Sequence, residues 1–211
     1  MEAVTLQEVY DTSGRPGARA FRTAARRRGL TITASEAQEF VRAQSAGQVL
    51  QGRLPSDGRV TAAREDSRWQ LDLLDFSKRR QQPGGHKYAL TVVDVFSRYL
   101  WAERMTEKSP EAALAAYRRI IASNRNQHPK EVSSDLGNEF SGVFAAYLED
   151  NGTANSKKDP QSVNSIAVVD RAQQSVKKIL AGLQASSNAY WSTTLKKAVD
   201  IYNDREHGAL Y

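Results

Sequence analysis

The chain has 211 residues, of which 40% are hydrophobic and 26% charged, a globular composition that excludes intrinsic disorder. It contains no cysteine, which excludes disulfides and cysteine-containing zinc sites, and only three separated histidines, which disfavours a histidine zinc site. The formal net charge of +6 favours a polyanionic partner such as nucleic acid. Without a signal-peptide core or a run of about 18 apolar residues, we expect a soluble protein with no membrane partner.

The first 47 residues are predicted to form a small helical domain without zinc. Amphipathic patterns predict three short helices, at residues 5–12, 18–28 and about 33–46. Gly29 is a typical helix end, and Thr33 or Ser35 is placed to cap the third helix. Short helices joined by a tight glycine turn are typical of a helix-turn-helix-like arrangement.

An arginine triplet, Arg26, Arg27 and Arg28, closes the second of these helices. These side chains are either contacts to nucleic-acid phosphates or a solvated helix face, and the sequence leaves both readings open. Residues 48–67 follow, with a proline, two glycines and no sustained period, so we predict a linker there. The predicted division is therefore a helical domain at 1–47, the linker at 48–67 and a catalytic core at 68–211.

The segment from residue 68 onward alternates between strand and helix patterns. Strands are predicted at residues 69–76, 87–95, 99–105, 132–135 and, more weakly, 153–156. Helices are predicted at residues 110–123 with Ser109 as cap, 142–148 with Ser141 as cap, 166–183 and 190–202. Three consecutive strands followed by alternating helices and strands predict an α/β fold, a mixed five-stranded sheet flanked by helices.

Three acidic positions, far apart in sequence, are candidates for one site. Asp135 ends a short β-branched run, WQLDLLDF (69–76) carries an acid in the first strand, and Asp170 lies on a late helix. Convergent carboxylates are what a pair of Mg²⁺ ions needs for in-line phosphoryl transfer. Asp72 and Asp75 fall on opposite faces of the first strand, so only one of them can point at such a site.

Two other acids have structural interpretations. Asp94 precedes a turn and is expected to fix it by side-chain to backbone hydrogen bonds. Glu139 is interpreted either as a group behind the metal ligands or, more commonly, as a charge at a helix start. Asp170 itself has an ordinary alternative, a solvated helical acid paired with a nearby base.

The order WQLD, YALTVVDVFSRY, SSDLGNEF and a late acidic helix resembles the catalytic core of retroviral and retrotransposon integrases, in the ribonuclease H-like superfamily. The resemblance implies a ribonuclease H-like fold with Asp72, Asp135 and Asp170 as catalytic residues and as ligands of two Mg²⁺ or Mn²⁺ ions. The family has glutamate in the third place. Because aspartate is one methylene shorter, its helix must lie closer to the metals, or one ion must bind through water. The N-terminal domain matches the family in position but lacks its zinc ligands.

The helix carrying Asp170 also offers basic and polar groups at helical spacing. In the resembled family this helix presents lysines to the DNA end, and Lys177 matches one such position; Gln174, Lys178 and Arg171 are further candidates. The alternative is that these are solubility charges on an amphipathic helix. Apolar residues of the last helix are interpreted either as core or as part of an oligomer interface.

The resemblance implies a function: 3′-end processing and DNA strand transfer that insert retroelement DNA into target DNA, with no covalent enzyme intermediate. The expected partners are retroelement DNA ends, target DNA and further copies of the chain, and the expected location is the nucleus, reached through cytoplasmic retroelement particles. Two alternatives stay open. One is another ribonuclease H-like nuclease or transposase, and the other is an inactive, domesticated integrase-like domain that binds nucleic acid or supports assembly.

Overall fold

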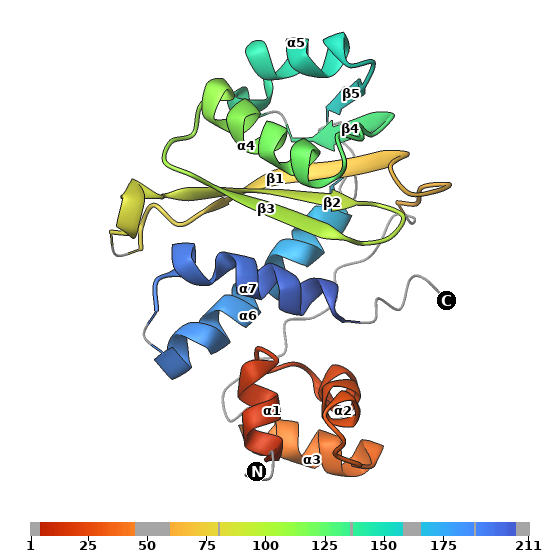
Figure 1. The fold of residues 1–211 in the computed structure, drawn as a ribbon, viewed down its shortest axis with the longest axis vertical. Helices are drawn as coiled ribbons and strands as arrows, with labels where there is room; N and C mark the ends of the chain where they lie inside the picture. Colours follow the sequence, from red (N-terminus) through yellow and green to blue (C-terminus); the bar gives the residue numbers. More distant parts are fainter. Residues whose placement is uncertain are drawn as a thin grey trace. The chain divides into compact units, whose positions relative to one another are not determined.

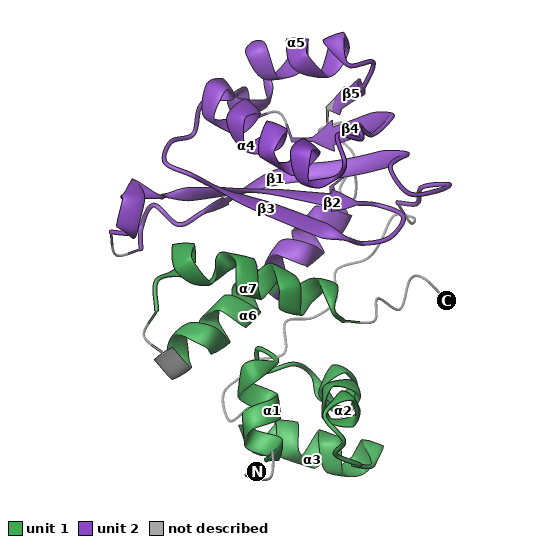
Figure 2. Ribbon diagram, in the orientation of Figure 1, with its two compact units in different colours: residues 1–55, 176–206 green, residues 56–175, 207–211 purple. Residues whose placement is uncertain are grey.

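A computed structural model describes residues 5–44, 60–79, 81–135, 137–157, 166–187 and 189–205. These residues fall into two compact units, one within 1–55 and 176–206 and the other within 56–175 and 207–211 (Figure 2). The predicted domain division stays a prediction, and most of its linker lies outside the described residues. Within the described ranges, no helix is long and apolar enough to cross a membrane.

The N-terminal segment forms three short helices (Figure 1), α1 (Leu6–Thr12), α2 (Ala18–Arg27) and α3 (Ala34–Gln44). Their apolar faces meet in a small core built from Val9, Tyr10, Phe21, Ala25 and Ala37. The three predicted helices are confirmed, and the predicted end of the third near residue 46 lies outside the described residues.

Local capping chemistry sets the helix ends. Glu36 N–H donates to Thr33 Oγ1 at 3.2 Å while Thr33 N–H donates to Glu36 Oε2 at 2.7 Å, so Thr33 caps α3 in a capping box. Ser35 is therefore not the cap. Gly29, with φ of +78°, ends α2 as predicted, because Leu30 N–H then reaches the Ala25 carbonyl at 2.9 Å.

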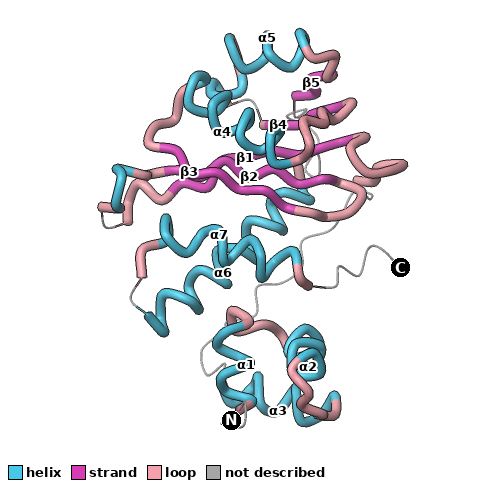
Figure 3. Tube along the Cα trace, in the orientation of Figure 1, coloured by secondary structure: helices cyan, strands magenta, loops and turns pink. Residues whose placement is uncertain are grey.

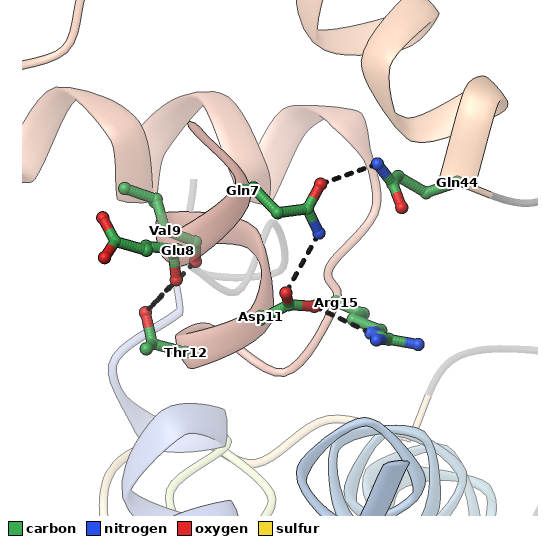
Figure 4. Close-up of polar contacts among 7 residues, drawn as sticks. All are labelled: Gln7, Glu8, Val9, Asp11, Thr12, Arg15 and Gln44. Carbon is green, nitrogen blue, oxygen red and sulfur yellow. Dashed lines mark hydrogen bonds and ion pairs between the residues drawn. The ribbon is translucent and has the colours of Figure 1, made fainter. Parts of the chain in front are cut away.

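A chain of polar side chains ties α1 to α3 (Figure 4). Gln44 Nε2 donates to Gln7 Oε1 at 2.8 Å, and Gln7 Nε2 donates to Asp11 Oδ2 at 3.0 Å. Arg15 Nε completes the chain by donating to Asp11 Oδ1 at 2.9 Å. The Gln7 hydrogen bond, supported by Arg15, lowers the pKa of Asp11.

Five strands form one mixed sheet in the order β3-β2-β1-β4-β5 (Figure 3). They are β1 (Arg68–Asp75), β2 (Tyr88–Asp94), β3 (Leu100–Met105), β4 (Glu131–Ser134) and β5 (Ala154–Lys157). β2 runs antiparallel to both β1 and β3, whereas β1, β4 and β5 are parallel. The predicted α/β fold with a mixed five-stranded sheet is confirmed.

Helices α4 (Pro110–Ser123) and α5 (Val143–Asp150) cover one face of this sheet (Figure 1). The core between them contains Trp69, Leu90, Tyr117, Phe140 and Leu148, all at most 1% exposed. Ser109 caps α4 as predicted, since Ala112 N–H donates to its Oγ at 3.2 Å.

The predicted cap of α5 is wrong. Ser141 Oγ instead donates to the Asn138 carbonyl, and the N-cap is Gly142 with φ +55° and ψ −123°. Only glycine adopts that conformation without strain, so the backbone turn rather than a side chain sets the start of α5.

The two C-terminal helices are α6 (Ala167–Ser187) and α7 (Trp191–Asn203). The first part of α6 belongs to the unit that contains the sheet, and the second part belongs to the other unit. On α7, Trp191, Leu195 and Val199 are at most 9% exposed within this single chain. Of the two interpretations open from the sequence, core packing therefore holds for these three side chains.

Candidate active site

The carboxyl ends of β1, β3 and β4 lie at one edge of the sheet. The strand directions require this, because β3 and β4 each run in the same sense as β1. Loops that leave the carboxyl ends of strands are the usual place for ligand sites in α/β sheets. Side chains near the ends of β1 and β4, and in the loop after β3, are therefore brought to a common edge.

Asp72 and Asp135 are neighbours across two parallel strands. The register pairs Gln70 with Ser133, so continuing it by two residues along both strands places Asp135 beside Asp72. Adjacent strands are about 4.8 Å apart. Asp135 leaves the strand in a tight turn, in which Gly137 N–H donates to Asp135 Oδ1 at 3.0 Å.

Gln70 holds the start of α6 against the sheet. Its side-chain Oε1 accepts from Val168 N–H at 3.0 Å and from Val169 N–H at 3.2 Å, and Gln70 is fully buried. These amides belong to the first turn of the helix, where backbone donors have no partner within the helix. The glutamine of WQLD therefore caps α6, whose first turn carries Asp170.

A second contact fixes α6 beside β1 and β2. Gln173 is buried, and its Nε2 donates to Thr91 Oγ1 at 2.9 Å. Thr91 Oγ1 in turn donates to the carbonyl of Asp72 at 2.7 Å. Because Asp170 lies one turn before Gln173, this chain of hydrogen bonds brings Asp170 toward Asp72.

The charges of both other candidate acids, Asp135 and Asp170, act on the carboxyl of Asp72. Burial is the main cause that raises the pKa of Asp72 from 3.8 to about 6, and the charges of Asp135 and Asp170 raise it further. Hydrogen bonds from Leu73 N–H and the Gln173 side chain act in the opposite direction. Asp75 is exposed on the other face, and its pKa is lowered by hydrogen bonds from Ser77.

The three acids fit a divalent cation in donor type and charge. Carboxylate oxygens are the ligands that Mg²⁺ prefers, and the pKa of Asp72 is raised mainly by burial and further by the negative charges of Asp135 and Asp170. Among the described residues, however, no three histidine, cysteine, aspartate or glutamate side chains are grouped closely enough to form a ready-made metal centre.

Glu139 lies at a helix start, as one of its two interpretations predicted, but it is buried and paired rather than a simple solvated charge. It lies in the short 3₁₀ turn η2 (Asn138–Phe140), its side chain is 2% exposed, and Lys108 Nζ lies 3.2 Å from its Oε1. This hydrogen bond raises the pKa of Lys108, and the charges of Asp135 and Asp72 add to the effect. Lys108 therefore lies at the same edge of the sheet as Asp72 and Asp135, which we call the acidic edge.

Asp94 has the structural role expected from the sequence. Its carboxylate accepts from Phe96 N–H at 3.2 Å and from Ser97 N–H at 3.1 Å, so it fixes the turn between β2 and β3.

The candidate DNA-binding residues of α6 are Arg171, Gln174, Lys177 and Lys178, and all four are exposed. In the N-terminal helices, Arg26, Arg27 and Arg28 are also exposed at the end of α2. Arg27 Nη1 lies 2.5 Å from Asp204 Oδ2, so its charge is already paired within its unit. A role in nucleic-acid binding stays a prediction for all seven residues.

Sequence reasoning missed Gln70, Gln173 and Lys108 as parts of this site. The signals for the two glutamines were a polar residue between two apolar ones in a strand and a polar residue on the apolar face of a helix. No local sequence pattern marks Lys108 as part of the site, because it is the direction of β3 that brings it to the edge with Asp72 and Asp135.

A mixed sheet in this order, with acids at its carboxyl edge and a helix capped onto β1, defines a ribonuclease H-like fold. Residues 62–163, just under half of the chain, match the family model described as "Integrase core domain". The match contains Asp72 and Asp135, and Asp170 follows it. No curated protein matches the sequence.

Two of the solved structures that are similar to this chain are integrase structures. One is a chain of the simian T-cell lymphotropic virus intasome in complex with PP2A regulatory subunit B56 gamma, with TM-score 0.60 and 16% identity over 92% of this chain and 67% of that one. The other is the catalytic core domain of BIV integrase, with TM-score 0.55 and 19% identity over 68% of this chain and 87% of that one. At these identities the similarity shows the fold.

Proposed function

We propose that this protein is a metal-dependent polynucleotidyl transferase of the integrase type. It trims DNA 3′ ends and joins them to target DNA by phosphoryl transfer, inserting retroelement DNA. The observation that carries this proposal is the placement of Asp72 beside Asp135 on parallel strands, with the helix that bears Asp170 bonded to the same sheet through Gln70 and Gln173. The integrase core domain match over residues 62–163 supports it.

Asp72, Asp135 and Asp170 would hold two divalent ions, Mg²⁺ or Mn²⁺. Bound there, the ions supply activation of the attacking oxygen and stabilisation of the leaving 3′ oxygen. The chain's own contribution is positional: Gln70 and Gln173 hold the helix that bears Asp170 against the strand that bears Asp72. Deprotonation of Asp72 is part of this role, since only its carboxylate form is a ligand.

The exposed residues of α6, Arg171, Gln174, Lys177 and Lys178, are proposed to contact the DNA end. Arg26, Arg27 and Arg28 are proposed to add phosphate contacts, for which Arg27 must exchange Asp204 for a phosphate. Joining two ends to one target requires two active sites, so a homo-oligomer working in the nucleus is proposed.

The test is strand resealing on a pre-formed branched DNA, which already holds the 3′ hydroxyl near the target phosphate and so asks least of the rest of the assembly. We expect product with Mg²⁺ or Mn²⁺, none after chelation, and none from Asp135→Asn. Asp75→Asn is the matched control, because Asp75 lies in the same strand as Asp72 but on the opposite face. Absence of product from folded wild-type protein with either metal would contradict the proposal.

A second candidate is an inactive integrase-like domain that binds nucleic acid or supports assembly. The observation that favours it is aspartate at position 170, where the resembled family has glutamate. Mn²⁺ separates the two candidates independently of turnover: an active site will gain thermal stability with Mn²⁺ in wild-type protein and not in Asp72→Asn.

A further inference from the structure

A lysine and a buried glutamate form a pair beside the acids that none of the proposed catalytic roles uses. Lys108 lies between the end of β3 at Met105 and the N-cap of α4 at Ser109. Its side chain is 51% exposed, whereas the side chain of its partner Glu139 is 2% exposed. The pair therefore has one end in the protein and the other in solvent.

The buried carboxylate of Glu139 lies against the backbone at Gly137. A Cβ atom at Gly137 would lie 2.7 Å from the Cδ and both carboxylate oxygens of Glu139, so the carboxylate occupies space that any other residue at 137 would fill. Burying a carboxylate without a partner is costly. Lys108 supplies the partner, with Nζ 3.2 Å from Glu139 Oε1.

The exposed end of the pair faces the acidic edge. Besides Glu139, the charges of Asp135 and Asp72 act on Lys108, and Lys108 and Lys78 both act on Asp75. An ammonium group has three N–H donors, and Glu139 accounts for one of them. A half-exposed ammonium anchored beside three carboxylates has donors left for an anion at the same edge.

We propose that Lys108, oriented by Glu139, binds a backbone phosphate of the nucleic acid next to the acidic site. A phosphate is repelled by Asp72, Asp135 and Asp170, and a fixed cation on the rim offsets that repulsion while Glu139 keeps the ammonium in place. This inference rests on the proposed function, because it requires a nucleic acid at the acidic edge. The alternative is that Lys108 serves only as the counter-charge of Glu139.

Salt dependence of DNA binding separates the two roles. Affinity for the branched DNA is measured by fluorescence anisotropy between about 50 and 200 mM salt, with Ca²⁺ in place of Mg²⁺. Each phosphate contact contributes about 0.9 to the slope of log affinity against log salt concentration. We expect Lys108→Ala to reduce the slope by about one contact and Lys108→Arg to retain it. Lys130→Ala is the matched control, since Lys130 is exposed in the same unit but precedes β4, at the opposite edge of the sheet.

A double variant covers the case in which Lys108→Ala fails to fold. In Lys108→Ala/Glu139→Gln the buried partner carries no charge, so the fold no longer needs the lysine. We expect the double variant to be folded and still to show the reduced slope. An unchanged slope in the folded double variant would overturn the proposal and leave Lys108 as a counter-charge. Strand resealing by wild-type protein is scored separately, so loss of the proposed function is distinguishable from loss of this contact.

Discussion

Replacing Gln70 by leucine removes the acceptor that caps α6. Two buried amides, Val168 N–H and Val169 N–H, then lose a partner at 3.0 and 3.2 Å. Each buried donor left unsatisfied costs about 1–3 kcal/mol, and loss of an N-cap typically costs about 1 kcal/mol. Because both amides share one oxygen, the two losses are not additive, and we expect the free energy of unfolding to fall by about 2–4 kcal/mol.

Urea unfolding measures that loss, and hydrogen exchange locates it. In Gln70→Leu, the amides of Val168 and Val169 will exchange faster than in the wild type. Amides in β2 will lose only the protection that corresponds to the lower global free energy of unfolding. Gln127→Leu is the control, because Gln127 is exposed and its replacement is expected to change stability by less than about 0.5 kcal/mol. Unchanged protection at both valine amides would refute the assignment of Gln70 as the cap.

Three further predictions concern the same unit. Because the pKa of Asp72 is raised, the metal-free folded state holds a proton that the unfolded state releases, and the free energy of unfolding falls as pH rises from about 4 to about 6. Asp72→Asn removes this ionisation, so urea unfolding at pH 7 will show the variant to be more stable than the wild type by up to about 3 kcal/mol. Gly137→Ala will cost about 1–3 kcal/mol by overpacking against Glu139, and the cost will shrink in a Glu139→Ala background. Tyr117→Phe will be neutral or stabilising by about 1 kcal/mol, since the buried hydroxyl has no hydrogen-bond partner among the described residues; a loss above 1 kcal/mol would contradict this.

Local patterns predicted the helices and strands well, because their signals lie within a few residues. Ser109 and Pro110 mark the start of α4, and the glycine at 29 marks the end of α2, by side-chain and backbone chemistry that needs no distant partner. The same reliance on local signals made the prediction for Ser141 wrong. A serine before an apolar run is a common cap, but the left-handed turn at Gly142 moved the helix start past it.

The partners within the site could not be predicted from local patterns. Gln70 and Val168 are 98 positions apart, and Gln173 and Thr91 are 82 apart, so no window of sequence contains either contact. The position of Glu139 at a helix start was predicted, but its burial was not, because a charge at the start of a helical turn is usually solvated, whereas the missing side chain of Gly137 makes room to bury this one.

The aspartate at position 170 was expected to require either a helix closer to the metals or an ion bound through water. In this chain the start of α6 is bonded to β1 directly through Gln70, and Gln173 bonds to Thr91 one turn later. With the backbone of α6 fixed at two points on the sheet, the Cα of Asp170 is held in place, and its short side chain has few rotamers through which to move the carboxylate. Its charge already acts on Asp72 across the interface between helix and sheet. A helix fixed close to the sheet can therefore offset the shorter side chain of aspartate, whereas a glutamate could reach the same site from a helix that is held less closely. For this reason we treat aspartate at position 170 as compatible with the proposed catalysis.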